Sequence, residues 1–235
     1  MKAGDLNTGE KITWCPGCLD FSVMLAAKQA IANLVNENKI ELNKVVGVSG
    51  VGCHDKIFDY IKTNFYHALH GRVMPTVFGI KFGNPELKVI GFGGDGATYS
   101  EGIAHLVHAC RYNADVTFIV LNNQVFSLTT GQATPASEKG LVTPSTPLGT
   151  KEFPVNPVNL TLTCGATFVA RGSAFDMPHL TKIIEEAIMH KGFSFVEIVL
   201  PCISYHNNTQ FLREHVYKLE NHDASSHKEA MKKSL

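Results

Sequence analysis

Two short patterns in the sequence contain residue types that bind metals and phosphates. The first is Cys15-Pro16-Gly17-Cys18, in which two thiols are separated by two residues. Thiolates at this spacing can share one metal centre, and a centre with four sulfur ligands needs two further cysteines from elsewhere in the chain. The second pattern is Gly94-Asp95-Gly96, with the pair Asn122-Asn123 further along the chain.

The Gly-Asp-Gly and Asn-Asn patterns contain the ligand types that magnesium prefers. The Asp95 carboxylate, the Asn123 amide oxygen and a nearby backbone carbonyl form a set of hard oxygen ligands. Glycines on both sides of Asp95 allow phosphate oxygens to approach the backbone closely. Gly, Asp and Asn are also common in ordinary turns, so either pattern alone is a weak indication. If the two patterns lie side by side in the fold, they predict a site for magnesium and a diphosphate.

Strands and helices alternate along the predicted fold. Short β-branched or apolar runs predict buried strands, and apolar residues at helical spacing predict helices. The predicted strands cover residues 44–51, 87–93, 115–123, 167–172 and 193–200. The predicted helices cover residues 19–37, 55–65, 101–113 and 177–192, and residues 124–160 are predicted to form a long ordered loop. This alternation predicts an α/β fold, with a parallel sheet covered by helices on both faces.

One domain is predicted over residues 1–205, followed by a polar C-terminal tail over residues 206–235. Ligands of open parallel sheets bind at the carboxyl ends of the strands. Asp95 follows one predicted strand and Asn123 ends the next one along the chain. The two residues are therefore expected to meet at one edge of the sheet.

Composition argues against several classes of partner and location. The formal net charge is +0 and charged residues make up 18% of the chain, so no basic surface is expected to bind nucleic acid. No apolar run reaches the ~18 residues of a membrane span, and the first residues lack the apolar core of a signal peptide. A cytoplasmic location is expected, where thiols stay reduced. The 6 cysteines are then expected to serve metal binding or chemistry rather than disulfides.

Gly-Asp-Gly followed by Asn-Asn on these elements resembles the signature of thiamine diphosphate enzymes. Most of the chain resembles the β subunit of the 2-oxoacid:ferredoxin oxidoreductases, which implies a thiamine diphosphate-binding fold. The residues that carry the resemblance are 14–18 (WCPGC), 49–56 (SGVGCHDK), 70–72 (HGR), 79–113, 122–135, 145–149, 165–172 and 201–202. Three residues depart from the usual pattern of the family: Ala97 replaces a second acid, His54 replaces a serine, and Phe126 replaces a tyrosine.

The resemblance implies a set of cofactor and substrate residues. Magnesium would be held by Asp95, Asn123 and the backbone carbonyl of Val125. The residues that would contact thiamine diphosphate are Val51, Gly52, Cys53, His54, His70, Gly94, Gly96, Ala97, Ser127 and Leu128. Lys56 would meet the substrate carboxylate, and the alternative for this residue is a solvated lysine on a helix.

Two further cysteines follow predicted strands at the same edge of the sheet. Cys53 comes after strand 44–51 and Cys202 after strand 193–200. The resemblance matches Cys15, Cys18, Cys53 and Cys202 to the ligands of one four-iron, four-sulfur (4Fe-4S) cluster. Tetrahedral sulfur also suits a structural zinc ion, although zinc ribbons usually bring two close cysteine pairs and this chain has one.

The resemblance implies one subunit of an enzyme that converts a 2-oxoacid, such as pyruvate or 2-oxoglutarate, and coenzyme A to acyl-CoA and carbon dioxide. Thiamine diphosphate would act as electron sink, and the cluster would pass electrons to ferredoxin. An α subunit with the pyrimidine-side domain would complete the site in an αβ heterodimer or a dimer of such pairs. Two alternatives stay open: the diphosphate-binding half of a non-redox thiamine 2-oxoacid decarboxylase, and a zinc-stabilised binding protein without catalysis.

Overall fold

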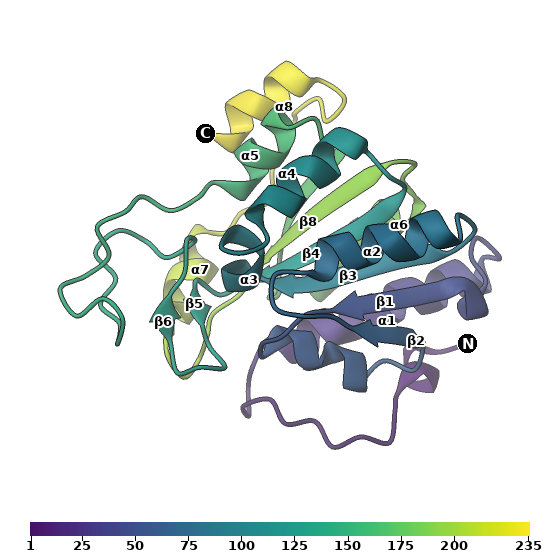
Figure 1. Ribbon diagram of the computed structural model, residues 1–235, viewed down its shortest axis with the longest axis horizontal. Coiled ribbons are helices and arrows are strands. Elements are labelled where there is room, and N and C mark those ends of the chain that lie inside the picture. The colour runs from purple at the N-terminus through teal and green to yellow at the C-terminus, as the bar shows by residue number, and fades with distance from the viewer.

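The computed structural model describes residues 1–235 and is built around one parallel sheet (Figure 1). The sheet has 6 strands in the order β2-β1-β3-β4-β8-β7, and every neighbouring pair is parallel. The strands are β1 (Val45–Ser49), β2 (Asn64–His67), β3 (Lys88–Gly94), β4 (Val116–Asn122), β7 (Phe168–Ser173) and β8 (Phe193–Val199). The predicted α/β fold is confirmed.

Helices cover both faces of the sheet (Figure 1). One face carries α1 (Asp20–Asn36) and α6 (Met177–Met189), and the other carries α2 (Val73–Gly83), α4 (Ile103–Tyr112) and α5 (Pro157–Thr163). The shorter elements are η1 (Ala3–Leu6), η2 (Leu42–Lys44), η3 (His54–Asp59), α3 (Asp95–Tyr99), β5 (Val125–Phe126), β6 (Gln132–Ala133), α7 (Thr209–His215) and α8 (His227–Ser234). Two hydrophobic cores result, one on each side of the sheet.

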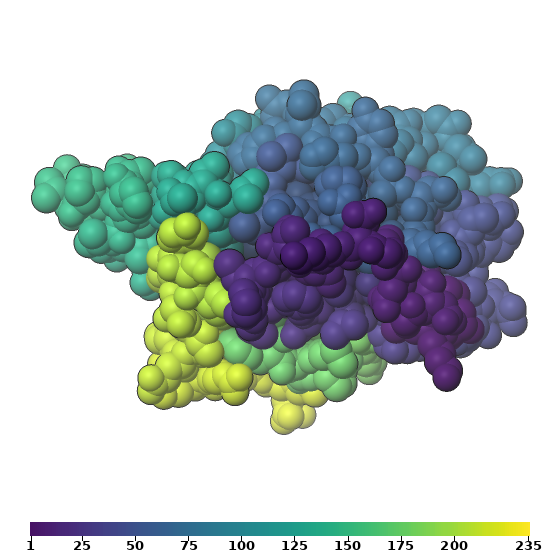
Figure 2. Space-filling model, turned by 90° about the horizontal axis from the view of Figure 1, so that it is seen from below, coloured from purple at the N-terminus to yellow at the C-terminus, as the bar shows by residue number.

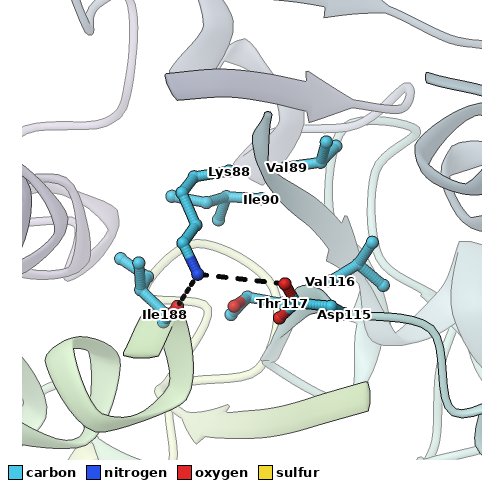
Figure 3. A pocket seen from close by; sticks show the side chains of 7 residues that line it. All are labelled: Lys88, Val89, Ile90, Asp115, Val116, Thr117 and Ile188. Atoms are coloured by element: carbon cyan, nitrogen blue, oxygen red, sulfur yellow. Dashed lines mark hydrogen bonds and ion pairs between the residues drawn. The ribbon is translucent and has the colours of Figure 1, made fainter. Parts of the chain in front are cut away.

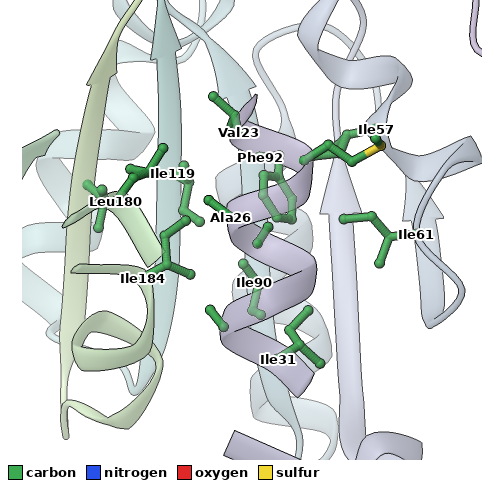
Figure 4. Close-up of a cluster of buried hydrophobic side chains, with 14 of the residues drawn as sticks. Val23, Ala26, Ile31, Ile57, Ile61, Ile90, Phe92, Ile119, Leu180 and Ile184 are labelled. Carbon is green, nitrogen blue, oxygen red and sulfur yellow. The ribbon is translucent and has the colours of Figure 1, made fainter. Parts of the chain in front are cut away.

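The core between the sheet, α1 and α6 is drawn in Figure 4. Val23 of α1 and Ile184 of α6 pack with Ile90 of β3 and Ile119 of β4, and all four side chains are buried. Successive strand residues point to opposite faces, so the same strands also supply apolar residues to the second core, such as Phe118. Packing on both faces fixes the two central strands β3 and β4 and therefore the positions of their carboxyl ends.

Two segments differ from the prediction. Residues 55–65, predicted as one helix, form the short 3₁₀ helix η3 and then the edge strand β2. Parallel pairing of β2 with β1 along its whole length overrides the local helical spacing. Helix α2 was not predicted; its sequence VMPTVFGIKFG is mostly apolar and contains Pro75. The proline is tolerated in the first turn, where backbone N–H groups have no partner within the helix.

The loop predicted over residues 124–160 ends earlier, because α5 begins at Pro157; the segment 124–156 contains the antiparallel hairpin of β5 and β6. Hydroxyl groups bridge its loops: Thr146 Oγ1 donates to the Leu141 carbonyl at 3.0 Å, and Thr143 Oγ1 lies 2.8 Å from Thr146 Oγ1. Part of this segment projects from the body of the molecule, as Figure 1 and the teal projection in Figure 2 show.

The polar residues after 205 form α7 and α8. Helix α8 packs against α5, where Asn159 Nδ2 donates to Ser234 Oγ at 3.0 Å and His227 Nε2 lies 3.2 Å from the Leu162 carbonyl oxygen. The domain boundary at residue 205 stays a prediction.

None of the helices combines the length and the apolar character that a membrane span requires.

The contact between β1 and β2 leads to a prediction on stability. Phe65 of β2 lies over Gly47 of β1, and a Cβ atom at position 47 would lie 2.3 Å from Phe65 Cζ. Phe65 also stacks on Phe92 with a centroid distance of 6.1 Å, which limits its freedom to move away. We expect Gly47→Ala to lower the free energy of unfolding by about 1–3 kcal/mol because the site would be overpacked. Urea unfolding measures this change.

Gly79 of α2 provides the matched control for Gly47. An added Cβ at Gly79 meets no atom within 4 Å. We expect Gly79→Ala to leave stability unchanged or to raise it by up to about 1 kcal/mol, since alanine favours the helix. Wild-type stability of Gly47→Ala would contradict the close contact with Phe65.

Candidate functional site

The Gly-Asp-Gly and Asn-Asn patterns meet at the carboxyl edge of the sheet. Asp95 begins α3 directly after β3, and Asn123 follows β4. The strands are neighbours, with Gly94 opposite Leu121, and the Asn123 backbone N–H donates to Asp95 Oδ1 at 3.3 Å. The expected meeting of these two strand ends is confirmed.

The Asp95 carboxylate is buried and bonded to neutral donors. Its side chain is 1% exposed, and Oδ2 accepts a hydrogen bond from Thr134 Oγ1 at 2.6 Å. Burial raises the pKa of Asp95 to about 6, because a charged carboxylate is costly away from water. A divalent cation beside Asp95 would stabilise the charged form, so this residue fits the predicted magnesium site. Thr134 was not predicted, since only the path of the long loop brings it to Asp95.

A tight turn follows Asn123. Gln124 has a φ of 65°, and the Asn123 side chain accepts from the Val125 backbone N–H at 3.2 Å and donates to Ser127 Oγ at 3.2 Å. These bonds place the predicted magnesium ligands Asn123 and Val125 and the predicted cofactor residue Ser127 on one compact loop. Val125 then pairs with Ala133 in the β5–β6 hairpin.

Close packing surrounds the second glycine of the Gly-Asp-Gly pattern. A Cβ atom at Gly96 would lie 2.3 Å from Phe126 Cε1, so only glycine fits beside this ring without a rearrangement. The His70 ring lies 5.9 Å from the Phe126 ring, and His70 Nδ1 lies 3.2 Å from Glu101 Oε2. Ala97 is buried in α3. The predicted cofactor residues His70, Gly96 and Ala97 therefore lie close to the Asn-Asn turn.

His54 is buried between two predicted sites. Its Nδ1 lies 2.8 Å from Asp20 Oδ1, and its ring approaches Gly94, with Cδ2 3.0 Å from the position that a Cβ would occupy. Burial alone lowers the pKa of His54, but the Asp20 carboxylate outweighs this effect and the pKa rises to about 9. Asp20 was missed from the sequence, although it lies two residues after Cys18.

Three chain segments bring the four predicted cluster cysteines to the same edge. The Trp14 indole N–H donates to the Cys53 carbonyl at 2.6 Å, and Cys15 Sγ lies 3.4 Å from Ser204 Oγ. Cys202 is buried, two residues before Ser204. Cys15 and Cys18 therefore lie on a loop that contacts the segments of both Cys53 and Cys202.

Burial distinguishes the four thiols. Cys15 is exposed, Cys18 and Cys53 are half-buried, and Cys202 is buried. Burial raises the pKa of Cys53, and the Ser127 hydroxyl lowers it in part. Cys53 and Ser127, which lies on the Asn-Asn turn, are therefore neighbours at this edge. Binding to iron would deprotonate the thiols regardless of their metal-free pKa.

The four predicted cluster cysteines do not form a site for a single metal ion. No three His, Cys, Asp or Glu side chains of the chain converge as ligands of a single ion do. Each ligand of a 4Fe-4S cluster binds a different iron, so its thiolates stand farther apart than those around one zinc ion. The segments that carry the four thiols converge at one edge without forming a site for a single ion.

The remaining predicted residues lie around the same edge or away from it. Lys56 Nζ donates to Thr13 Oγ1 at 2.8 Å, beside the Cys15 loop. Val51 and Leu128, two predicted cofactor contacts, are 39% and 46% exposed, so these side chains are available to another molecule. Cys110 packs in the second core and Cys164 beside it, so both serve packing rather than this edge.

The opposite edge of the sheet holds a different group of residues. Figure 3 shows a hollow between the starts of β3 and β4, where Lys88 Nζ donates to the Ile188 carbonyl at 3.2 Å and lies 4.0 Å from Asp115 Oδ2. These contacts cross the hollow, and none of the predicted site residues lies there. The chemistry suggested by the sequence is confined to the carboxyl edge.

Comparisons with known proteins agree with this arrangement. Residues 50–198 match the family described as "Thiamine pyrophosphate enzyme, C-terminal TPP binding domain". The chain is similar to the 2-oxoacid:ferredoxin oxidoreductase subunit beta of Saccharolobus solfataricus, with 43% identity over 88% of this chain and 68% of that one. It is also 37% identical to the 2-oxoglutarate oxidoreductase subunit KorB of Mycobacterium tuberculosis, over 86% of this chain and 53% of that one.

A solved structure has the same fold. It is the 2-oxoglutarate:ferredoxin oxidoreductase from Magnetococcus marinus with 2-oxoglutarate, coenzyme A and succinyl-CoA bound. The TM-score is 0.95 at 33% identity, and the alignment covers 100% of this chain and 80% of that one. The chain thus spans about two thirds of the archaeal relative and about half of the mycobacterial one. These matches show that the chain belongs to the β subunits of the 2-oxoacid:ferredoxin oxidoreductases, and that residues 50–198 form its thiamine pyrophosphate-binding domain.

Proposed function

We propose that this chain binds magnesium, thiamine diphosphate and one 4Fe-4S cluster, and that together with an α subunit it catalyses the CoA-dependent oxidative decarboxylation of a 2-oxoacid. The observation that carries the proposal is the meeting of two groups at one sheet edge. One is the buried Asp95 carboxylate beside the Asn123 turn, and the other is the set of segments with four cysteines.

The magnesium ion and the diphosphate are assigned to the ends of β3 and β4. Asp95 provides the full negative charge, and Asn123 and the Val125 carbonyl provide neutral oxygens. The residues assigned to the cofactor around them are Val51, Gly52, Cys53, His54, His70, Gly94, Gly96, Ala97, Ser127 and Leu128. When bound, thiamine diphosphate supplies an electron sink for decarboxylation. The chain anchors the diphosphate, and its buried carboxylate neutralises part of the charge of the metal.

The iron–sulfur cluster is assigned to Cys15, Cys18, Cys53 and Cys202. The Trp14 bond to the Cys53 carbonyl and the influence of the Ser127 hydroxyl on the pKa of the Cys53 thiol support a short path from the cofactor site to these sulfurs. A cluster at this position would accept electrons from the cofactor and pass them to ferredoxin. Zinc has no redox role, so it would leave those electrons without an acceptor.

The substrate class is assigned as a 2-oxoacid with coenzyme A. The name of the Magnetococcus relative gives 2-oxoglutarate and coenzyme A as bound molecules. Lys56 is assigned to the substrate carboxylate, and its bond to Thr13 would hold it beside the cysteine edge. A cation at this place would attract the carboxylate that every 2-oxoacid carries.

An α subunit is assigned to the other side of the cofactor. Thiamine chemistry needs an acid beside the pyrimidine ring, and the acid nearest in sequence to the Gly-Asp-Gly pattern, Glu101, lies beside His70, a residue assigned to the cofactor. The exposed side chains of Val51 and Leu128 would be covered by a second chain. Both observations support an obligate partner that carries the pyrimidine-side domain.

The test is anaerobic purification of this chain with and without its α partner, followed by analysis of iron, sulfide, zinc and thiamine. The complex is expected to contain about four irons per β chain and to reduce ferredoxin or a viologen dye when a 2-oxoacid and coenzyme A are added. The chain alone, reconstituted with cluster and cofactor, is expected to be inactive. Stoichiometric zinc without iron would contradict the cluster, and turnover by the isolated chain would contradict the need for a partner.

A further inference from the structure

Glu197 on β8 is a buried acid that lies behind the candidate site. Its side chain is 0% exposed, and its two carboxylate oxygens have different partners. Oε1 accepts from Asn122 Nδ2 at 2.8 Å and from the Tyr99 hydroxyl at 3.3 Å, while Oε2 accepts from Arg171 Nε at 2.7 Å. A buried carboxylate with three donors is held in one orientation, because each lost bond would leave a polar group unpaired.

The two partners of Oε1 lie on the two elements that carry Asp95 and Asn123. Tyr99 is the last residue of α3, the short helix that begins with Asp95. Asn122 is the last residue of β4 and directly precedes Asn123. Burial, together with the Glu197 carboxylate, holds the pKa of Tyr99 well above its usual range, so the hydroxyl remains a donor. One oxygen of Glu197 therefore connects the helix that carries Asp95 with the strand end that carries Asn123.

The Asn122 side chain connects Glu197 to the turn at Gln124. Its amide nitrogen is bound by Glu197, and its amide oxygen accepts from the Gln124 backbone N–H at 3.1 Å. Gln124 has a φ of 65°, a conformation that residues other than glycine seldom adopt without support. The bond to Glu197 fixes which end of the Asn122 amide faces Gln124. Without Glu197, the amide could turn and place its nitrogen against the Gln124 N–H.

We propose that Glu197 is a positioning residue for magnesium and thiamine diphosphate binding, acting through Asn122 on the turn of Asn123 to Val125 and through Tyr99 on α3. The proposal rests on the proposed function, since it assumes that this turn holds the magnesium diphosphate. The hydrogen-bond partners of the Glu197 side chain are Asn122, Tyr99 and Arg171, none of which is a metal ligand or cofactor residue assigned above. Its effect is on geometry: it holds Asn123 and Asp95 at fixed positions relative to each other before the ion binds.

A purely structural role would rest on the ion pair of Glu197 with Arg171. Arg171 lies beside Glu197 on the neighbouring strand β7, and its side chain is 50% exposed. It binds Oε2, whereas Asn122 and Tyr99 bind Oε1. The two roles can therefore be separated by substitutions that remove one set of bonds and keep the other.

The experiment measures the affinity of the α–β complex for magnesium thiamine diphosphate by calorimetry, after removal of the cofactor with a chelator. Glu197→Val removes all three bonds, Glu197→Gln keeps an oxygen acceptor for Asn122 and Tyr99, and Arg171→Met removes only the ion pair. Thr117→Val is the matched control, because Thr117 is a buried residue of β4 whose hydroxyl bonds to the Ala187 carbonyl at 3.0 Å, at the opposite end of the strand from Asn122. Melting temperatures are recorded for all variants.

Glu197→Val is expected to weaken cofactor affinity about tenfold or more, equivalent to about 1.4 kcal/mol. Glu197→Gln, Arg171→Met and Thr117→Val are expected to stay within about threefold of wild type, even where the melting temperature falls. Wild-type affinity of Glu197→Val would overturn the proposal. Equal weakening in Arg171→Met would also overturn it, because the ion pair would then account for the effect.

A second pair of substitutions tests the same link if Glu197→Val does not fold. Asn122→Asp places two carboxylates against each other and is expected to weaken cofactor affinity about tenfold. Adding Glu197→Gln to Asn122→Asp restores one acid and one amide with the same total charge, and the affinity is expected to return to within about threefold of wild type. No recovery in the double variant would overturn the proposal.

The outcome also separates this inference from the proposed function. If the wild-type complex does not bind magnesium thiamine diphosphate, the proposed function fails and the Glu197 variants cannot be the cause. If wild type binds the cofactor and Glu197→Val binds equally well, the proposed function stands and the positioning role fails.

Discussion

Asp95→Asn is expected to weaken the affinity of the α–β complex for magnesium thiamine diphosphate by at least about 100-fold, since substitutions that only support a metal ligand already cost 10–100-fold. Asparagine keeps the shape of the side chain: its oxygen can accept from the Asn123 N–H, and its amide nitrogen can donate to the Thr134 hydroxyl, which can accept as well as donate. It removes the full negative charge that the proposed site offers to magnesium. Calorimetry on the chelator-treated complex measures the change.

Stability is expected to respond in the opposite direction. Burial raises the pKa of Asp95 to about 6, so the charged carboxylate is unfavourable in the cofactor-free fold at neutral pH. Replacing it with a neutral amide is therefore expected to leave the melting temperature of the cofactor-free protein unchanged or raised. Loss of affinity together with retained stability would assign Asp95 to the cofactor rather than to the fold.

Asp115→Asn provides the control at the other edge of the sheet. Asp115 Oδ2 lies 3.3 Å from Lys81 Nζ and 4.0 Å from Lys88 Nζ, far along the strands from the candidate site. This variant is expected to keep wild-type affinity for the cofactor. If Asp95→Asn also kept that affinity, the assignment of the Gly-Asp-Gly pattern to magnesium would be wrong.

Cys202→Ser is expected to remove the cluster and with it the reduction of ferredoxin. Of the four assigned thiols Cys202 is the most buried, and serine oxygen is a poor replacement for thiolate at iron. Iron is expected to fall from about four per chain to a small fraction of that value. Affinity for magnesium thiamine diphosphate should persist, because the ends of β3 and β4 are untouched.

Cys164→Ser is the matched substitution outside the assigned set. Cys164 directly follows α5 and packs beside the second core, away from the carboxyl edge of the sheet. The variant is expected to retain iron, sulfide and ferredoxin reduction. Equal loss of iron in Cys164→Ser and Cys202→Ser would show that the ligands have been assigned wrongly.

The sequence alone determined the fold class and the meeting of Asp95 with Asn123. Strand and helix patterns are local, and parallel strands place their carboxyl ends at one edge, so two residues that follow neighbouring strands must lie close together. The same reasoning brought Cys53 and Cys202 to that edge. The resemblance to a family then proposed what these residues bind, and the comparisons show the family itself.

Only the tertiary structure decided which side chains support these residues. Thr134 reaches Asp95 across 39 positions of sequence, Asp20 reaches His54 across 34, and Glu197 reaches Asn122 across 75. Such bonds depend on loop paths and on strand order, which no local pattern encodes. The same cause explains β2, where pairing with β1 replaced the predicted helix. Residue types therefore predicted the chemistry of the site, and long-range packing decided which side chains position its residues.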